Sequence, residues 1–186
     1  YNYRVGPQYT FVIPNGFRLF TGYQYQQKAS YRNNQKYRLD KLYKWQEENH
    51  ALGSLPSSRD SLLLSLDANN SYKGYYISKQ NSVSLGFGCS KSKNHNNVFF
   101  NTNVSIGYKS EKLDYRNSLL NTSVKQYNWV SGLSLNMGFT INKYSFYGTI
   151  TSKMETPDLY SKITRSDNSN PLAISLGNPN LKNSRK

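Results

Sequence analysis

The stretch from Tyr127 to Ile141, YNWVSGLSLNMGFTI, decides the fold class of this chain. Large apolar or aromatic residues fall on every second position, and small or polar residues fall between them. The first series is Tyr127, Trp129, Leu133, Leu135, Met137, Phe139 and Ile141, with Ser131 among them, and the second includes Asn128, Gly132, Ser134, Asn136 and Gly138. A period of two is typical of a β-strand with one apolar and one polar face.

The same alternation recurs on both sides of this stretch. It covers Val5–Ile13, Phe17–Tyr25, Val83–Cys89 with a start as early as Tyr72, Val98–Tyr108, and Tyr144–Lys153. The facing of the last stretch stays open, because Tyr144, Phe146 and Ile150 fall in one series and Tyr147 in the other. We therefore predict an all-β chain, an antiparallel up-and-down meander of about six long strands.

The connections alternate between short and long. The short ones are Pro14-Asn15-Gly16, SKNHNN at 92–97 and Asn142-Lys143; the long ones are Gln26–Asp67, Leu113–Val124 and Glu155 onward. In the first long connection we expect a helical part or a small hairpin at SLLLSL, 61–66. Long strands, a Ser/Asn/Gly face and alternating connection lengths are typical of a transmembrane β-barrel. An aromatic girdle is expected near the strand ends, formed by Tyr72, Tyr75, Tyr76, Tyr108, Tyr127, Trp129 and Tyr144.

The charge of the chain is strongly basic, with 24 Lys plus Arg against 10 Asp plus Glu, a net charge of +14. The basic residues are spread over the whole chain without a nucleic-acid-binding motif, so we predict no nucleic acid as partner. The acidic residues avoid 1–39, 68–110 and 115–154, where the alternation is strongest. The single cysteine, Cys89, excludes a disulfide scaffold. The longest apolar run, Leu62–Leu64, is too short for a membrane-spanning helix.

Residues with catalytic or metal-binding potential do not form a recognisable set. His50 and His95 lack a Cys or acidic partner at ligand spacing, and Glu47-Glu48 is a pair that water solvates in most loops. We predict no enzyme, no metal site and no cofactor. The alternative to a membrane barrel is a soluble all-β binding module for carbohydrate or anionic ligands. The candidate ligand-binding residues, in the expected extracellular loops, are Tyr43, Trp45, Tyr115, Arg116, Tyr160 and Asn170.

The segment NSNPLAISLGNPNLK, Asn168–Lys182, resembles a stretch of the TonB-dependent receptor-like outer membrane β-barrel family of Bacteroidetes. The core of that motif, NPL-x-I-x-LGNP-x-L, matches Asn170, Pro171, Leu172, Ile174, Leu176, Gly177, Asn178, Pro179 and Leu181. Residues 55–72 and 113–121 are also similar to loops of that family. The Lys-Pro-Glu that follows the motif in the family is replaced here by Lys182-Asn183-Ser184.

The resemblance implies a fragment of a barrel of about 22 strands in the bacterial outer membrane. Such receptors take up nutrients with force that TonB, ExbB and ExbD deliver to a plug. Residues 1–186 are then expected to be one partial β-barrel domain, with neither a plug domain nor a signal peptide. They would contribute wall, lumen and extracellular loops, in contact with outer-membrane lipid. Because six strands leave two open edges, we expect missing strands and a plug from the same barrel or another chain.

Overall fold

The computed structural model describes residues 1–43, 45, 50–51, 53–93, 96–164, 166–167 and 175–186. Its main feature is one antiparallel sheet with the strand order β1-β3-β4-β5-β6-β7-β10, in which β2 also pairs with β3. The strands are β1 (Asn2–Val5), β2 (Gln8–Ile13), β3 (Phe17–Asn34), β4 (Tyr72–Lys93), β5 (Asn96–Arg116), β6 (Asn121–Ile141), β7 (Tyr144–Glu155) and β10 (Ser184–Arg185). A separate two-stranded ladder joins β8 (Ser166–Asp167) to β9 (Ser175–Leu176). The predicted all-β meander is confirmed.

The helical elements are short and lie in the connections. Those whose bounds lie within the described residues are the 3₁₀ turns η1 (Pro14–Gly16), η2 (Leu39–Lys41) and η3 (Leu159–Lys162), and the helix α2 (Arg59–Ser65). The hairpin considered at 61–66 is thus a helix instead, and Leu66 pairs with Tyr37 through an isolated bridge. None of the helices formed by the described residues is long and apolar enough to cross a membrane.

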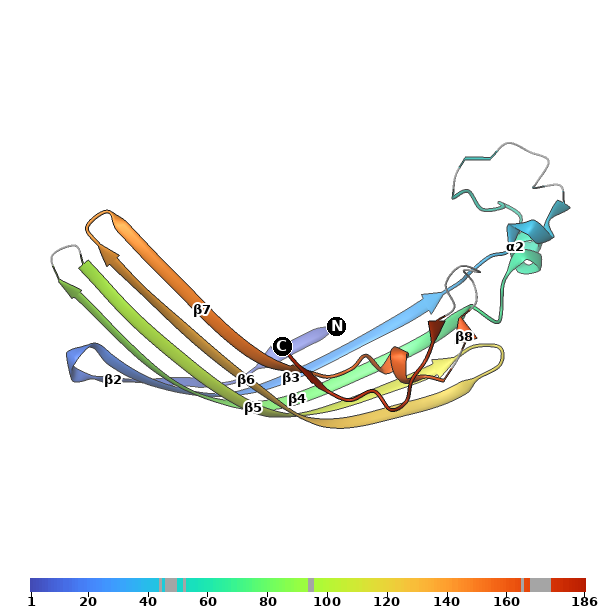
Figure 1. The fold of residues 1–186 in the computed structure, drawn as a ribbon. Coiled ribbons are helices and arrows are strands. Elements are labelled where there is room, and N and C mark those ends of the chain that lie inside the picture. Colours follow the sequence, from blue (N-terminus) through green and yellow to red (C-terminus); the bar gives the residue numbers. More distant parts are fainter. Residues whose placement is uncertain (44, 46–49, 52, 94–95, 165, 168–174) are drawn as a thin grey trace.

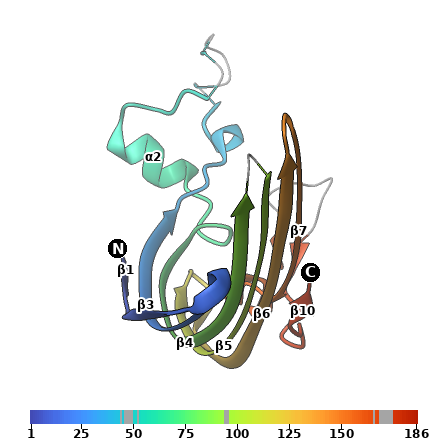
Figure 2. The ribbon, with the colours of Figure 1, turned by 90° about the vertical axis from the view of Figure 1, so that its left-hand side faces the viewer.

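The sheet is open and strongly curved. Along the strands it bends into a trough, with α2 beyond one end (Figure 1). Seen from the other end, β3 and β7 rise on opposite sides while β4, β5 and β6 form the floor (Figure 2). We refer to the end near α2 as the α2 end and to the other as the short-turn end. The inner surface of the trough is the concave face and the outer surface is the convex face.

The first predicted strand, Val5–Ile13, is interrupted in the structure. Val5 lies opposite Tyr25 and Gln8 opposite Gly22, so β1 and β2 keep one continuous register along β3. The break falls at Pro7, whose ring removes the N–H that a ladder needs. Its carbonyl still accepts a hydrogen bond of 3.1 Å from the Tyr23 N–H.

Two predicted long connections have the wrong bounds. β3 continues to Asn34, well into the expected loop 26–67, and β5 and β6 extend so far that the expected loop 113–124 shrinks to the turn 117–120. The Asn117 side chain closes this turn, because its Oδ1 accepts the N–H groups of Leu119 and Leu120 at 3.0 and 2.6 Å.

The cross-strand register fixes which residues share a face. Leu133, Leu135, Met137, Phe139 and Ile141 lie on one face, and Ser134, Asn136 and Gly138 on the other, as the alternation predicts. The same register decides the facing of β7. Phe139 lies opposite Phe146 and Leu135 opposite Ile150, whereas Tyr147 lies opposite Gly138 on the polar face. Partners in a ladder project to the same side of the sheet. Tyr144, Phe146 and Ile150 therefore belong to the apolar face.

The predicted tight turns at 14–16 and 142–143 connect neighbouring strands, and the connection at 94–95 lies outside the described residues. Asn15 and Asn142 adopt positive φ angles of 68° and 52°, and Gly16 one of 84°. Asn and Gly tolerate this left-handed region better than other residues. A Cβ on Gly16 would also lie only 2.2 Å from the Ser90 carbonyl oxygen.

Gly16→Ala is predicted to destabilise the protein more than Gly53→Ala. Both glycines have positive φ angles, 84° and 83°, but a Cβ on Gly53 would meet nothing within 4 Å. Backbone strain alone costs about 1 kcal/mol. The collision of Gly16→Ala with the β4 backbone is expected to add about 2 kcal/mol or more. Equal losses in the free energy of unfolding in urea would contradict the packing of this turn against β4.

Candidate functional site

The convex face carries a broad band of apolar side chains, most of them exposed and a few half-buried. Its members on β3 to β7 are Phe17, Leu19, Tyr23, Val83, Leu85, Phe87, Val98, Phe100, Val104, Ile106, Leu133, Leu135, Met137, Phe139, Phe146 and Ile150. Leu85 and Ile106 are 58% and 56% exposed. On described strands β2 to β7, the convex face holds no charged residue between the ladder position of Lys91 and the ladder position of Lys79. We call this region the apolar band.

Aromatic rings border the apolar band toward the α2 end. Tyr108 packs against Tyr127 with ring centroids 6.3 Å apart and against Trp129 at 5.5 Å. Tyr127 and Trp129 remain 60% and 65% exposed. This aromatic border consists of residues that prefer the boundary between an apolar and an aqueous phase.

The chain does not cover its own apolar surface. Its accessible area is 13505 Å², whereas a compact soluble monomer of this mass exposes about 9,100 Å². Among the described residues, the buried hydrophobic ones are Ala29, Leu113, Tyr115, Leu159 and Ile163. A single curved sheet has no second layer on its convex side, so the apolar band has no partner within the part of the chain that is described.

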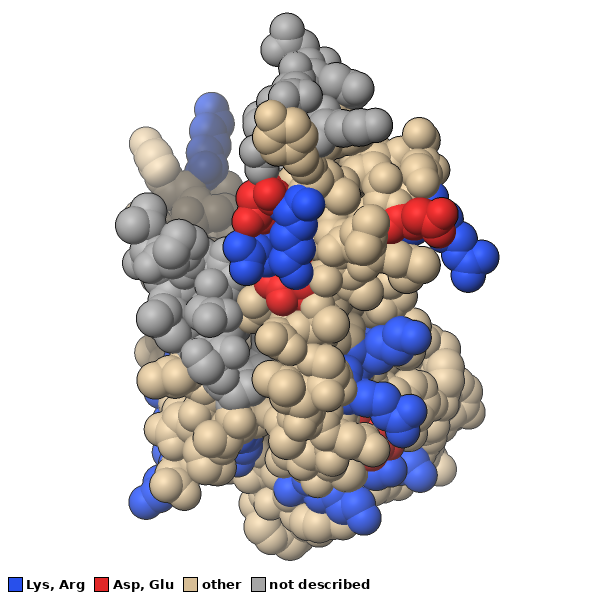
Figure 3. Space-filling model, turned by 90° about the vertical axis from the view of Figure 1, so that its right-hand side faces the viewer, with Lys and Arg blue, Asp and Glu red and all other residues tan. Residues whose placement is uncertain are grey.

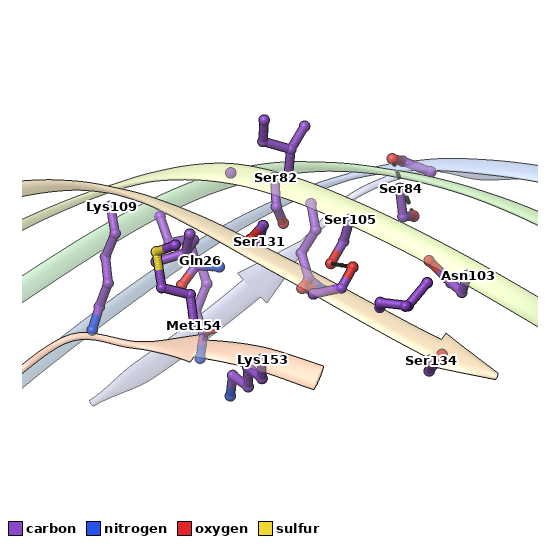
Figure 4. Close-up of a pocket in the computed structure, with 18 of the residues that line it drawn as sticks. Gln26, Ser82, Ser84, Asn103, Ser105, Lys109, Ser131, Ser134, Lys153 and Met154 are labelled. Atoms are coloured by element: carbon purple, nitrogen blue, oxygen red, sulfur yellow. Dashed lines mark hydrogen bonds between the residues drawn. The ribbon is translucent and has the colours of Figure 1, made fainter. Parts of the chain in front are cut away.

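The concave face encloses a hollow of about 800 Å³ lined mainly by small polar side chains (Figure 4). Its lining includes Gln26, Gln80, Ser82, Ser84, Asn103, Ser105 and Ser134, together with the cationic Arg4, Lys109 and Lys153. Some of these groups are paired along the wall; Ser105 Oγ donates to the Gly132 carbonyl at 3.5 Å. The surface is rich in donors and acceptors that water or a polar solute satisfies.

At the α2 end, residues 156–163 fold back over the concave face, and we call them the cap segment (Figure 1). Leu159 and Ile163 of this segment form a buried cluster with Leu113 and Tyr115 of β5. Partly buried Tyr72, Tyr76, Leu120, Val124 and Tyr160 surround the cluster. The cap segment therefore obstructs one end of the trough.

A buried carboxylate lies beneath the cap segment, beyond the aromatic border. Glu111 is 4% exposed; its Oε1 lies 2.8 Å from Lys109 Nζ and accepts a short hydrogen bond from the Tyr76 hydroxyl. Its Oε2 accepts from Gln126 Nε2 at 2.7 Å. Burial opposes ionisation, but the donors Lys109, Tyr76 and Gln126 outweigh it, so the pKa of Glu111 lies below its usual value.

The same network holds the cap segment to the sheet. Gln126 Nε2 also donates to the Pro157 carbonyl at 3.0 Å, and Lys109 Nζ donates to Thr156 Oγ1 at 2.9 Å. Gln126 and Lys109 thus contact Glu111 and the segment at the same time. A fully paired buried carboxylate of this kind fixes the position of its donors.

Tyr160 anchors the middle of the cap segment. The Arg32 guanidinium carbon lies 4.8 Å from the centre of its ring, and Tyr72 packs beside it with ring centroids 5.7 Å apart. Gly74 permits this approach, because a Cβ there would lie 2.3 Å from the Tyr160 hydroxyl oxygen. Burial raises the pKa of the Tyr160 hydroxyl, although the Arg32 charge opposes this.

The predicted ligand-binding residues lie in different environments. Tyr43 is 75% exposed in the connection after β3, and the ring of Trp45 stacks on His50 with centroids 3.4 Å apart. Arg116 is exposed at the end of β5. Tyr115 is not in a loop, as we had expected, but inside β5 with 1% exposure, so its side chain is part of the buried cluster rather than open to a ligand. The structure brings Tyr115 and Tyr160 together, both against Tyr72.

The part of the sequence motif that is described supports the cap segment. The Asn178 N–H donates to the Ser161 carbonyl at 2.8 Å. A Cβ on Gly177 would lie 1.7 Å from the Ile163 carbonyl oxygen, so only glycine fits there. Pro179 follows directly, while Asn170, Pro171 and Leu172 lie outside the described residues.

Metal-binding groups do not gather in the described part of the chain: no three His, Cys, Asp or Glu side chains there could share an ion. His95, Glu47 and Glu48 lie outside the described residues. No protein-family model matches the chain, and no curated protein matches it either.

Glu111→Gln is predicted to loosen the cap segment. The amide presents an N–H₂ group to donors that need an acceptor, so hydrogen exchange at the Ser161 and Ile163 amides should become faster. Acid should act in the same direction. A lowered pKa means that the stabilisation is complete above the unfolded carboxyl's pKa of about 4.3 and is lost as the pH falls through the folded value.

The matched control is Asp114→Asn. Asp114 lies on the opposite face of the same strand and pairs with Lys112 at 2.7 Å. It makes no described contact with the cap segment, so exchange at Ser161 and Ile163 should stay unchanged. Equal acceleration by both substitutions would contradict the role assigned to Glu111.

Proposed function

We propose that this chain forms part of the wall of a transmembrane β-barrel in the bacterial outer membrane, with its convex face in lipid. The observation that carries the proposal is the charge-free apolar band. Exposed apolar patches of that extent are rare on soluble monomers. In lipid the same side chains are solvated, and the aromatic border lies where a membrane girdle belongs.

The height of the band agrees with this placement. On β4, Lys79 and Lys91 are 91 − 79 = 12 residues apart. At about 3.3 Å per residue that is about 40 Å along the strand, and a tilt of about 40° reduces it to about 30 Å across the membrane. The apolar band of outer-membrane barrels is about 25 Å tall, which fits between the two lysines.

The concave face then borders a polar lumen, and the cap segment narrows the lumen at the outer side. The open edges at β1–β2 and β7 are costly in lipid, because each unpaired backbone group there lacks a hydrogen-bond partner. Further strands, from the same protein or another chain, complete the barrel in this proposal. A soluble binding module for carbohydrate or anionic ligands would instead need a cover for the whole apolar band.

We assign the barrel to the TonB-dependent receptor type on the resemblance of residues 168–182 alone. On that assignment the barrel takes up a nutrient, a plug closes the lumen, and TonB, ExbB and ExbD supply the force. The test is whether the full-length protein binds the periplasmic domain of TonB in a pull-down. If the protein inserts in membranes but does not bind TonB, the proposed barrel wall still stands and the assignment to a TonB-dependent receptor is refuted.

Leu135→Arg is predicted to impair insertion, and Asn136→Arg to be tolerated. Leu135 lies near the middle of the apolar band and Asn136 is its neighbour on the concave face. A lipid-facing arginine near the bilayer midplane costs about 2–4 kcal/mol, whereas the lumen hydrates one. The readout is the fraction of full-length protein with heat-modifiable mobility in membranes. Equal tolerance would mean that the convex face does not meet lipid.

A labelling experiment on intact cells tests which side is outside. With Cys89→Ala as background, Tyr43→Cys should react with an impermeant maleimide, because Tyr43 lies in the long connection. Lys143→Cys, in the short β6–β7 turn, should react only after the outer membrane is permeabilised, since short turns face the periplasm. The reverse pattern would invert the proposed orientation.

A further inference from the structure

A group of basic residues follows the aromatic border on the convex face. It consists of Lys73 and Lys79 on β4, Lys112 and Arg116 on β5, and Lys125 on β6, and we call it the basic collar. Four of the five are exposed, and Lys112 is half-buried. Figure 3 views the molecule from the α2 end and shows several Lys and Arg side chains on the lower half of this surface.

The collar places like charges next to one another. Lys73 lies directly opposite Arg116, and Lys112 directly opposite Lys125. Like charges in such cross-strand positions repel and weaken the sheet. The described residues provide one ion pair to the collar, between Lys112 and Asp114 at 2.7 Å. Asp114 also attracts Lys125, and the other three cations of the collar form no ion pair within 4 Å among the described residues.

The position of the collar indicates what neutralises it. Lys79 lies opposite Ser110, which lies opposite Tyr127 of the aromatic border. The collar is thus continuous with the apolar band, one step beyond the level at which lipid tails end. A partner that contacts both regions needs apolar chains beside the apolar band and negative charge beside the basic collar. An anionic lipid has both parts, whereas an acidic protein surface supplies only the charge.

We infer that the basic collar binds the phosphate groups of an anionic glycolipid in the leaflet that surrounds the α2 end of the barrel. This inference rests on the proposed function, because it requires the apolar band to lie in lipid. Lys and Arg near an anionic membrane surface each strengthen attachment about fivefold. Arg116 adds a planar fork that matches phosphate oxygens.

The experiment uses the full-length protein, purified in neutral detergent, with diphosphoryl lipid A as the probe. Bound lipid is counted by native mass spectrometry across a lipid titration. The triple variant Lys79→Gln/Lys112→Gln/Lys125→Gln is compared with Lys91→Gln/Lys93→Gln/Lys143→Gln, which removes the same charge at the short-turn end. We expect the collar variant to bind about tenfold more weakly or worse. The control variant should change by less than about twofold.

The phosphate dependence is tested on the unmodified protein. Lipid A stripped of its phosphates should bind at least about tenfold more weakly than the diphosphoryl form. Millimolar inorganic phosphate should not displace the lipid, because it lacks the chains that the apolar band holds. Equal binding of the two lipids, or equal losses in the two triple variants, would overturn the inference even if a variant folded poorly.

Failure of the proposed function gives a different result. In that case urea or carbonate would extract the protein from membranes and its mobility would not be heat-modifiable. If the protein resists extraction but binds the two lipids equally, the inference about the basic collar is refuted and the proposed barrel wall still stands.

Discussion

The structure depends on the cross-strand register of one long antiparallel ladder. β4, β5 and β6 pair without a break over about 20 residues each, so every outward residue on one strand lies beside an outward residue on the next. A slip of one position would move the whole apolar band to the concave face. Such a slip is opposed by the short connections between neighbouring strands. These are the tight turns at 14–16 and 142–143 and the turn at 117–120 that Asn117 closes. The register therefore determines which side chains lie on the convex face and which lie on the concave face.

The sheet has no conventional core, and this determines where its stability comes from. The buried cluster of Leu113, Tyr115, Leu159 and Ile163 is confined to one end. Along the rest of the trough the inner face is mainly polar, apart from Phe20, Phe99 and Tyr147, the outer face is apolar, and no second layer of the described chain packs on either. Hydrophobic stabilisation therefore depends on what surrounds the convex face, rather than on contacts inside the chain. The edges of the sheet at β2 and at most of β7 have no neighbouring strand among the described residues, so backbone groups there are left unpaired within the sheet.

The sequence predicted the middle of each strand well and the ends poorly, for one physical reason. Within the apolar band, the large residues of β5 occupy even positions, from Val98 to Tyr108. Beyond the aromatic border they move to odd positions, Leu113 and Tyr115, because the concave face is covered there by the cap segment and the convex face carries Lys112 and Arg116. This inversion of phase breaks the alternation, so a period-two analysis interprets 113–124 as a loop. The full length of these strands could be predicted only by an analysis in which the apolar residues can change from one face of the strand to the other along its length.

The candidate site was harder to predict because its parts are distant in sequence and its key group is inconspicuous. Glu111 is one of 10 acidic residues, and nothing local distinguishes it. Its role follows from register, which places it opposite Gln126 and on the same face as Tyr76 and Lys109. The cap segment is then fixed from two sides, by this network and by Tyr160 between Arg32 and Gly74. Gly177 and Asn178 support the segment from behind, so part of the motif that carried the family resemblance has a structural role. Two of these attachments lie on the wall itself. Moving the cap segment away from the sheet therefore requires breaking the carboxylate network around Glu111 as well as the contacts of Tyr160.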